Sequence, residues 1–198
     1  MSSLPVVSIV QGEEPSRAVP KAIDLIGGPT RFFSEQDFVF IKPNVCGGVP
    51  GKRGTFTSLE LLSAIVSVLK SRVKRVAIGE ADSSMYLAER MLKENGIIDS
   101  ASRMGVDIVD LSKGDMVEVA VSNGCALDSI RVSRTLREAT KIISAPVAKT
   151  HITTDVTLSI KNMFGVLPER KKGRLHSRID KILVDIAKTF PPTLSWTG

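Results

Sequence analysis

Polar side chains capable of chemistry are concentrated in residues 145–176, APVAKTHITTDVTLSIKNMFGVLPERKKGRLH. This segment holds both histidines of the chain, His151 and His176, together with Lys149 and Lys161. A partly buried lysine can have a lowered pKa and act as an acid, a base or an amine nucleophile. A neutral histidine near it can move a proton or bind a metal ion. Each residue alone is more often a surface lysine or a packed histidine, but their clustering favours a site.

The spacing within this segment indicates which side chains can act together. Lys149 and His151 are two residues apart, so on a strand both face the same way and can contact one carboxylate or phosphate. Thr157 and Lys161 are four residues apart, so on a helix they share one face. We therefore take His151, Lys149 and Lys161 as candidate catalytic residues.

The positive charge of the chain is also local. Of the net charge of +6, residues 1–140 contribute nothing, with 17 basic and 17 acidic residues, while residues 141–190 carry 10 basic and 4 acidic ones. Such an excess favours an anionic partner, although a solvated basic face explains it equally well. The basic run 170–174 lacks the interleaved aromatics of a nucleic-acid surface. A solvent-exposed loop that closes over an anionic ligand fits it better.

The pattern of the whole chain predicts an α/β fold, with a mostly parallel sheet flanked by helices and a small β pair near 117–132. Apolar strands alternate with helical stretches, and nothing divides residues 1–198 into more than one domain. Main strands are expected at 6–10, 37–41, 73–79, 106–111 and 141–145. Helices are expected at 16–25, 57–70, 83–95, 155–164 and 178–190.

Polar groups follow three of the expected strands. Lys42 and Asn44 follow the second, Glu80 and Asp82 the third, and the segment with Lys149 the fifth. Ligands of open α/β sheets bind beyond the carboxyl ends of the strands, so these groups are expected at one crevice. Asp82 is interpreted as a cap of the next helix. Glu80 remains open between a general base and a ligand of a divalent cation.

The loop 44–57 is rich in glycine and precedes a helix that Thr57 and Glu60 are predicted to cap. It is not a Walker A loop, because Cys46 occupies the place of the first glycine and Arg53 that of the final Ser or Thr. A helix N-terminus favours an anion, which makes Thr57 a candidate ligand contact. A mobile glycine-rich loop is the equal alternative.

Other features of the sequence indicate whether the protein binds metal and where in the cell it is located. Cys46 and Cys125 have no metal-site spacing and are expected to be buried structural cysteines, so no metal site is predicted. The N-terminus has no signal-peptide pattern, and the longest apolar run, near 61–69, is too short to cross a bilayer. A cytoplasmic protein without membrane contact is therefore expected, and the sequence does not specify a cofactor.

Four motifs in order, FIKPN at 40–44, GE at 79–80, APVAKTH at 145–151 and LSIKNMFG at 158–165, resemble the family of unknown function numbered 362. His176 also fits its pattern, and the resemblance covers roughly residues 5–195. It implies an α/β domain and an association with iron–sulfur proteins, some members being joined to ferredoxin-like cysteine motifs that this chain lacks. Members also continue further, with an acidic residue where Thr197 stands, so the resemblance implies a C-terminally short chain.

Two main hypotheses follow, with nonspecific nucleic-acid binding ranked behind both. The first is an enzyme, or a domain derived from one, that binds a small carboxylate or phosphate at the carboxyl edge of the sheet. Its catalytic residues would be those named above, and its substrate-binding residues Lys42, Asn44, Thr57, Glu80, Asn162, Gly165 and His176. The alternative is a redox-associated protein that acts with an iron–sulfur partner of ferredoxin type. In that case the basic run 170–174 would dock the acidic partner.

Overall fold

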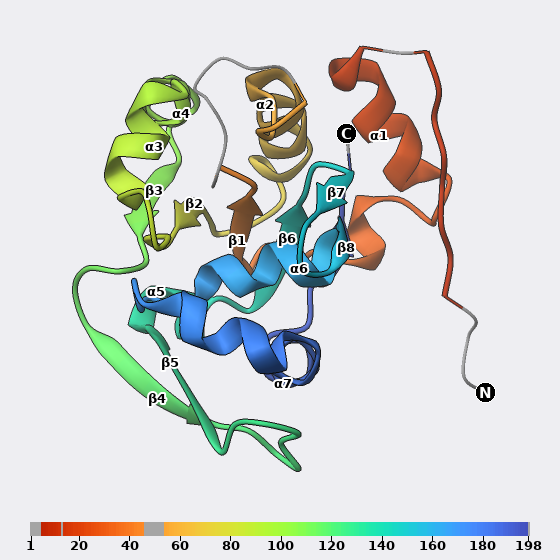
Figure 1. The fold of residues 1–198 in the computed structure, drawn as a ribbon. Coiled ribbons are helices and arrows are strands. Elements are labelled where there is room, and N and C mark those ends of the chain that lie inside the picture. The colour runs from red at the N-terminus through yellow and green to blue at the C-terminus, as the bar shows by residue number, and fades with distance from the viewer. Residues whose placement is uncertain (1–4, 13, 46–53, 198) are drawn as a thin grey trace.

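A five-stranded parallel sheet forms the centre of the computed structural model, which describes residues 5–12, 14–45 and 54–197 (Figure 1). The strand order is β3-β2-β1-β6-β9, and every neighbouring pair is parallel. The strands are β1 (Phe38–Pro43), β2 (Arg75–Glu80), β3 (Asp107–Asp110), β6 (Lys141–Ala145) and β9 (Leu194–Ser195). The predicted α/β fold with a mostly parallel sheet is confirmed.

Helices cover both faces of the sheet because its central strands are apolar on both sides. Along β1, Val39 and Ile41 face one core cluster, and Phe38 and Phe40 face the other. The first cluster packs against α1 (Pro15–Asp24), α2 (Leu59–Leu69), α3 (Ala88–Glu94) and α4 (Ile97–Met104). The second packs against α5 (Arg134–Glu138), α6 (Ser159–Met163) and α7 (Ile179–Thr189).

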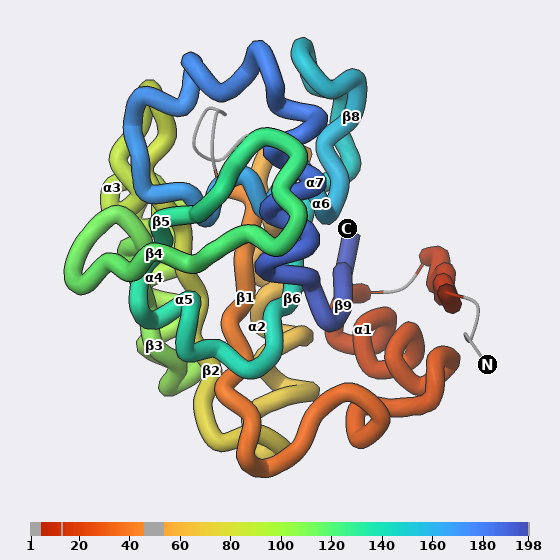
Figure 2. The backbone as a smooth tube through the Cα atoms, turned by 90° about the horizontal axis from the view of Figure 1, so that it is seen from below, coloured from red at the N-terminus to blue at the C-terminus, as the bar shows by residue number. Residues whose placement is uncertain are grey.

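Two antiparallel pairs lie outside the main sheet. The pair β4 (Met116–Ala120) and β5 (Ser129–Ser133) confirms the β pair predicted near 117–132, and its loop lies against α7 (Figure 2). The pair β7 (Lys149–His151) and β8 (Asp155–Thr157) was not predicted.

The predicted helix 155–164 is therefore too long. Asp155 has a φ of 58°, a left-handed conformation that turns the chain back on itself, so residues 155–157 pair with β7 and α6 begins only at Ser159. Three 3₁₀ turns complete the elements: η1 (Pro29–Arg31), η2 (Phe164–Val166) and η3 (Lys172–Arg178).

Three further predictions need correction: one strand, the start of one helix and the cap of another. Residues 6–10 form no strand; they run extended beside α1 (Figure 1), where Ser8 Oγ donates to Ala22 O at 2.8 Å, and Val7 and Ile9 are 82% and 86% exposed. Helix α3 begins at Ala88 rather than near residue 83. Ser58, not Thr57, caps α2, its Oγ accepting from Leu61 N at 3.1 Å.

Candidate functional site

A pocket of about 400 Å³ lies at the carboxyl ends of β1 and β2, beside the β7–β8 hairpin and α6. Nine of the ten residues predicted for the site line it: Lys42, Asn44, Glu80, Lys149, His151, Lys161, Asn162, Gly165 and His176. Thr57 is not among the lining residues. Thr55, Thr157, Phe164 and Lys172 also line the pocket, and sequence reasoning had not assigned them to the site.

Two walls of the pocket are joined by a hydrogen bond between distant parts of the chain. Lys149 Nζ, from β7, donates to Asn44 Oδ1 at 3.1 Å and to Thr55 O at 2.9 Å. Asn44 follows directly on β1, so the ammonium group connects the hairpin to the end of the central strand. The side chains expected to converge from separate strand ends are therefore brought together.

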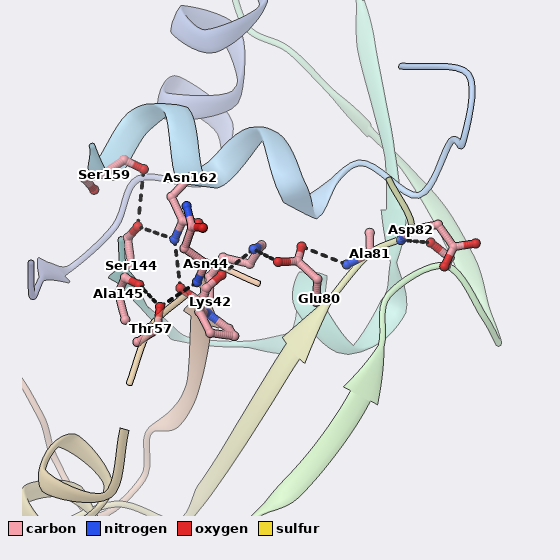
Figure 3. Close-up of polar contacts among 12 residues, drawn as sticks. Lys42, Asn44, Thr57, Glu80, Ala81, Asp82, Ser144, Ala145, Ser159 and Asn162 are labelled. Carbon is pink, nitrogen blue, oxygen red and sulfur yellow. Dashed lines mark hydrogen bonds and ion pairs between the residues drawn. The ribbon is translucent and has the colours of Figure 1, made fainter. Parts of the chain in front are cut away.

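The hydroxyl of Thr57 has a structural role. It accepts from Asn44 N at 2.7 Å and donates to Ala145 O at 2.6 Å, which ties the ends of β1 and β6 to the start of α2 (Figure 3). The hydroxyl of Thr57 thus holds the strand ends together, while Ser58 occupies the N-cap position of α2.

Lys42 and Glu80 form a buried ion pair at the floor of the pocket. Lys42 Nζ lies 2.5 Å from Glu80 Oε2, and each side chain is 1% exposed. Lys42 also donates to Pro43 O at 2.6 Å, while Glu80 Oε1 accepts from Ala81 N at 3.0 Å (Figure 3). A buried charge must be compensated, so each of the two residues is required by the other.

Gly165 packs directly on this ion pair. A Cβ atom at this position would lie 2.7 Å from Glu80 Oε1 and 2.8 Å from Lys42 Nζ, closer than real Cβ contacts allow. The position therefore has no room for a side chain. This steric limit gives a physical reason for a glycine at the end of the LSIKNMFG motif.

Asn162 fixes α6 to the sheet. Its Nδ2 donates to Lys42 O at 2.9 Å and to Ser144 Oγ at 3.0 Å, and Ser144 Oγ donates to Ser159 O at 3.2 Å (Figure 3). The buried amide thus connects α6 to β1 and β6. Asp82 Oδ1 accepts from Ala88 N, the first amide of α3, at 2.8 Å, although the N-cap position of this helix is Leu87.

His151 is half-buried in β7, and its pKa is lowered from the ordinary value of 6.5. Burial is the main cause, and the positive charges of Lys161, His176 and Lys149 add to it. Its Nδ1 accepts from Thr153 N at 3.1 Å, so in the neutral ring Nε2 carries the proton. At neutral pH His151 is therefore a hydrogen-bond donor through Nε2.

An aromatic group forms another side of the pocket. The rings of Phe164 and His176 meet edge to face with centroids 5.5 Å apart, and Lys161 Nζ lies 4.9 Å from the Phe164 centroid. Such contacts orient a ring and a cation without neutralising the charge. His176 Nδ1 also lies 3.1 Å from Lys172 O, which anchors the ring to η3.

The electrostatics of the pocket are strongly positive. The described lining residues include four lysines and one carboxylate, Glu80, a net charge of +3 without counting the histidines; the lysines are Lys42, Lys149, Lys161 and Lys172. The expectation that residues 170–174 form one exposed basic loop is wrong for Lys172, whose side chain is only 4% exposed. It faces the pocket, whereas Arg170, Lys171 and Arg174 are exposed.

The expectation of buried structural cysteines is wrong for Cys125, which is exposed, and Cys46 lies outside the described residues. In the part of the chain that the structure describes, no three His, Cys, Asp or Glu side chains are grouped as metal ligands. Within the same residues, no helix is long and apolar enough to cross a bilayer.

A family model described as "Domain of unknown function (DUF362)" matches residues 39–197, which include every described lining residue of the pocket. The chain belongs to this family. Thylakoid-associated protein sll1697 of Synechocystis sp. is 25% identical over 181 residues, which is 87% of this chain and 54% of the relative. The DUF362 chain thus spans about half the length of that relative.

Among solved structures, a protein from Thermotoga maritima aligns with a TM-score of 0.45 and 11% identity. The alignment covers 92% of this DUF362 chain and 51% of the other.

Proposed function

We propose that this DUF362 chain is an enzyme, or a domain derived from one, that binds a small carboxylate or phosphate in the pocket. The excess of lysines over carboxylates among the lining residues carries the proposal. Among the described lining residues the one carboxylate, Glu80, forms an ion pair with Lys42, and Lys149, Lys161 and Lys172 add three further positive charges. Low-dielectric walls focus the potential of such charges and favour an anion.

Within this proposal the lining groups have different roles. Lys149 and Lys161 supply charge, and His151 donates a hydrogen bond through Nε2 to an oxygen of the anion. From the same atom it can pass a proton to the substrate as a general acid. The Lys42–Glu80 pair is neutral as a unit, so it shapes the floor of the pocket rather than adding attraction.

A thermal-shift screen tests the proposal with inorganic phosphate, acetate and citrate. Wild type is compared with His151→Ala, Lys149→Ala and the matched control Lys74→Ala. Lys74 is exposed and precedes β2, at the opposite end of the strands from the pocket. An anion that binds only the folded state raises the Tm by mass action.

The proposal predicts a shift in wild type and Lys74→Ala that is lost or strongly reduced in the two pocket variants. One charge-assisted hydrogen bond contributes about 1.5–3 kcal/mol, or roughly ten- to a hundredfold in affinity. Equal shifts in all four proteins would mean that any anion binding is diffuse. No shift with any of the three anions would contradict the proposal.

A second candidate function rests on the exposure of Arg170, Lys171 and Arg174. These side chains could dock an acidic redox protein of ferredoxin type, with association that weakens as salt rises. Charge reversal in Lys171→Glu and Arg174→Glu should then abolish binding to a ferredoxin. Binding that is unchanged by both substitutions would exclude this surface as the docking site.

A further inference from the structure

Two buried threonines near the site differ in how their hydroxyls are bonded. Thr57 is 4% exposed and uses its hydroxyl both as donor and as acceptor. Thr157 is 3% exposed, and its Oγ1 has no hydrogen-bond partner among the described residues. Thr157 lines the pocket and Thr57 does not. The hydroxyl that lacks a partner therefore belongs to the threonine that lines the pocket, and its oxygen is itself buried.

The β7–β8 hairpin fixes where the Thr157 side chain lies. Thr157 is directly opposite Lys149 in the antiparallel register, and His151 is two residues further along β7. Side chains directly opposite each other share one face of the pair, with Cβ atoms about 4.5–5.5 Å apart. Lys149, His151 and Thr157 consequently project from the same face of the hairpin, and all three line the pocket.

A buried hydroxyl without a partner is costly, and buried polar groups nearly always have one. Valine has nearly the same shape and is at least as favourable in a strand, so packing alone gives no reason for a hydroxyl at residue 157. We propose that Thr157 donates a hydrogen bond to an oxygen of the bound anion, next to the oxygen that Lys149 contacts. This inference rests on the proposed function and adds a binding residue to it.

The position of Thr157 opposite Lys149 also limits which anions can bind both side chains. An anion with at least two oxygen atoms can accept from the Lys149 ammonium and the Thr157 hydroxyl at the same time, as a carboxylate or phosphate does. A chloride ion can accept from both donors, but only at one atom, so it cannot fill two separate acceptor positions. At equal ionic strength chloride should therefore compete more weakly than an oxyanion.

The test compares Thr157→Val, Thr157→Ser and the matched control Thr57→Val. The probe is inorganic phosphate or citrate, whichever binds wild type more tightly by isothermal titration calorimetry. Without ligand, Thr157→Val should melt at or above the wild-type Tm, and its Kd should rise roughly tenfold or more. Thr157→Ser should bind like wild type. Thr57→Val should lower the Tm without ligand, because it leaves the Asn44 amide and the Ala145 carbonyl without their partner.

The outcomes separate the two proposals. If wild type binds neither probe, this inference is overturned, and the proposed function is overturned with it when acetate also fails to bind. If wild type binds and Thr157→Val binds equally well, the anion site stands and only the role of Thr157 is overturned. A lower Tm of Thr157→Val without ligand would also overturn it, because the hydroxyl would then be needed by the fold itself.

Discussion

Lys149 Nζ donates a hydrogen bond to Asn44 Oδ1 at 3.1 Å, across 105 residues of sequence. One partner follows β1, and the other begins the β7–β8 hairpin. The bond holds two sides of the pocket together, because it connects the end of the sheet to the hairpin that carries His151 and Thr157. A positive group is thus held at the boundary between scaffold and hairpin, where an anion could contact it.

Gly165→Ala should destabilise the fold through the buried ion pair. The added Cβ would lie within 2.8 Å of both Lys42 Nζ and Glu80 Oε1. Overpacking of this kind typically costs about 1–3 kcal/mol, measurable by urea denaturation. Gly173→Ala is the matched control, because its Cβ would meet nothing within 4 Å. If Gly165→Ala and Gly173→Ala are equally stable, then Gly165, in η2, is not packed against the ion pair.

Lys42 and Glu80 should be strongly coupled in a double-mutant cycle. Lys42→Met or Glu80→Gln alone leaves one uncompensated buried charge, which typically costs about 3–5 kcal/mol of the free energy of unfolding. The double variant should cost clearly less than the sum of the two, because no buried charge remains. Additive losses would mean that the two side chains do not depend on each other.

The pKa of His151 should lie below 6.5, with burial as the main cause and the charges of Lys161, His176 and Lys149 added to it. The chain has two histidines, so two ring signals in a ¹H NMR titration suffice, assigned with His176→Gln. Lys149→Met should raise the pKa of His151, and Lys74→Met should leave it unchanged. A His151 pKa at or above 6.5 in wild type would contradict the electrostatic account.

The same shift predicts how stability depends on pH. Between the folded pKa of His151 and 6.5 the unfolded chain binds more protons than the folded one. The stability that His151 contributes is therefore complete above pH 6.5 and is lost as pH falls through the folded pKa. His151→Gln should flatten this part of the curve of unfolding free energy against pH. An unchanged slope would show that another group causes it.

Asp185 should anchor the β4–β5 loop to α7. Its carboxylate accepts from the backbone amides of Cys125, Ala126 and Leu127 at 2.6, 2.8 and 2.9 Å. Burial raises the pKa of this carboxyl, but these hydrogen bonds and the charge of Lys188 outweigh it, so the pKa lies below 3.8. Asp185→Asn should lower the free energy of unfolding at pH 7. The loss should be about 1.5–3 kcal/mol for each of these hydrogen bonds that the asparagine side chain cannot make.

The exposed Asp128, in the same loop, provides the control Asp128→Asn. The stability that Asp185 contributes is present above pH 3.8 and is lost as pH falls through its folded pKa. The difference between wild type and Asp185→Asn should therefore shrink in acid. A difference that stays constant down to pH 2 would assign it to packing instead.

The arrangement of strand ends could be predicted from the sequence because it follows from a general rule. Once apolar strands alternate with helices, the sheet is parallel, and the residues after its strands meet at one edge. The same rule predicts that Lys42, Glu80 and Lys149 meet at one crevice. The two-sided burial of β1 has the same origin, since a central parallel strand is apolar on both faces.

Other features depend on contacts that no local pattern encodes. Strands of three residues such as β7 and β8 are too short for a periodic signal, and the turn at Asp155 uses a conformation that is rare outside glycine. Thr157 was therefore expected on a helix. The inward position of Lys172 could not be predicted from the sequence either, because a run of basic residues does not show which side chain η3 turns toward the pocket.

The most direct test of the anion site uses the two histidine ring signals as reporters. Both histidines line the pocket, while Trp196, the one tryptophan of the chain, does not. The protein is titrated with inorganic phosphate and with citrate, and chloride of equal ionic strength is the reference. We predict that at least one of the two oxyanions shifts both histidine ring signals and raises the pKa of His151. Trp196 fluorescence should stay constant. If neither oxyanion moves either ring signal more than chloride does, the pocket does not bind small oxyanions and the account is contradicted.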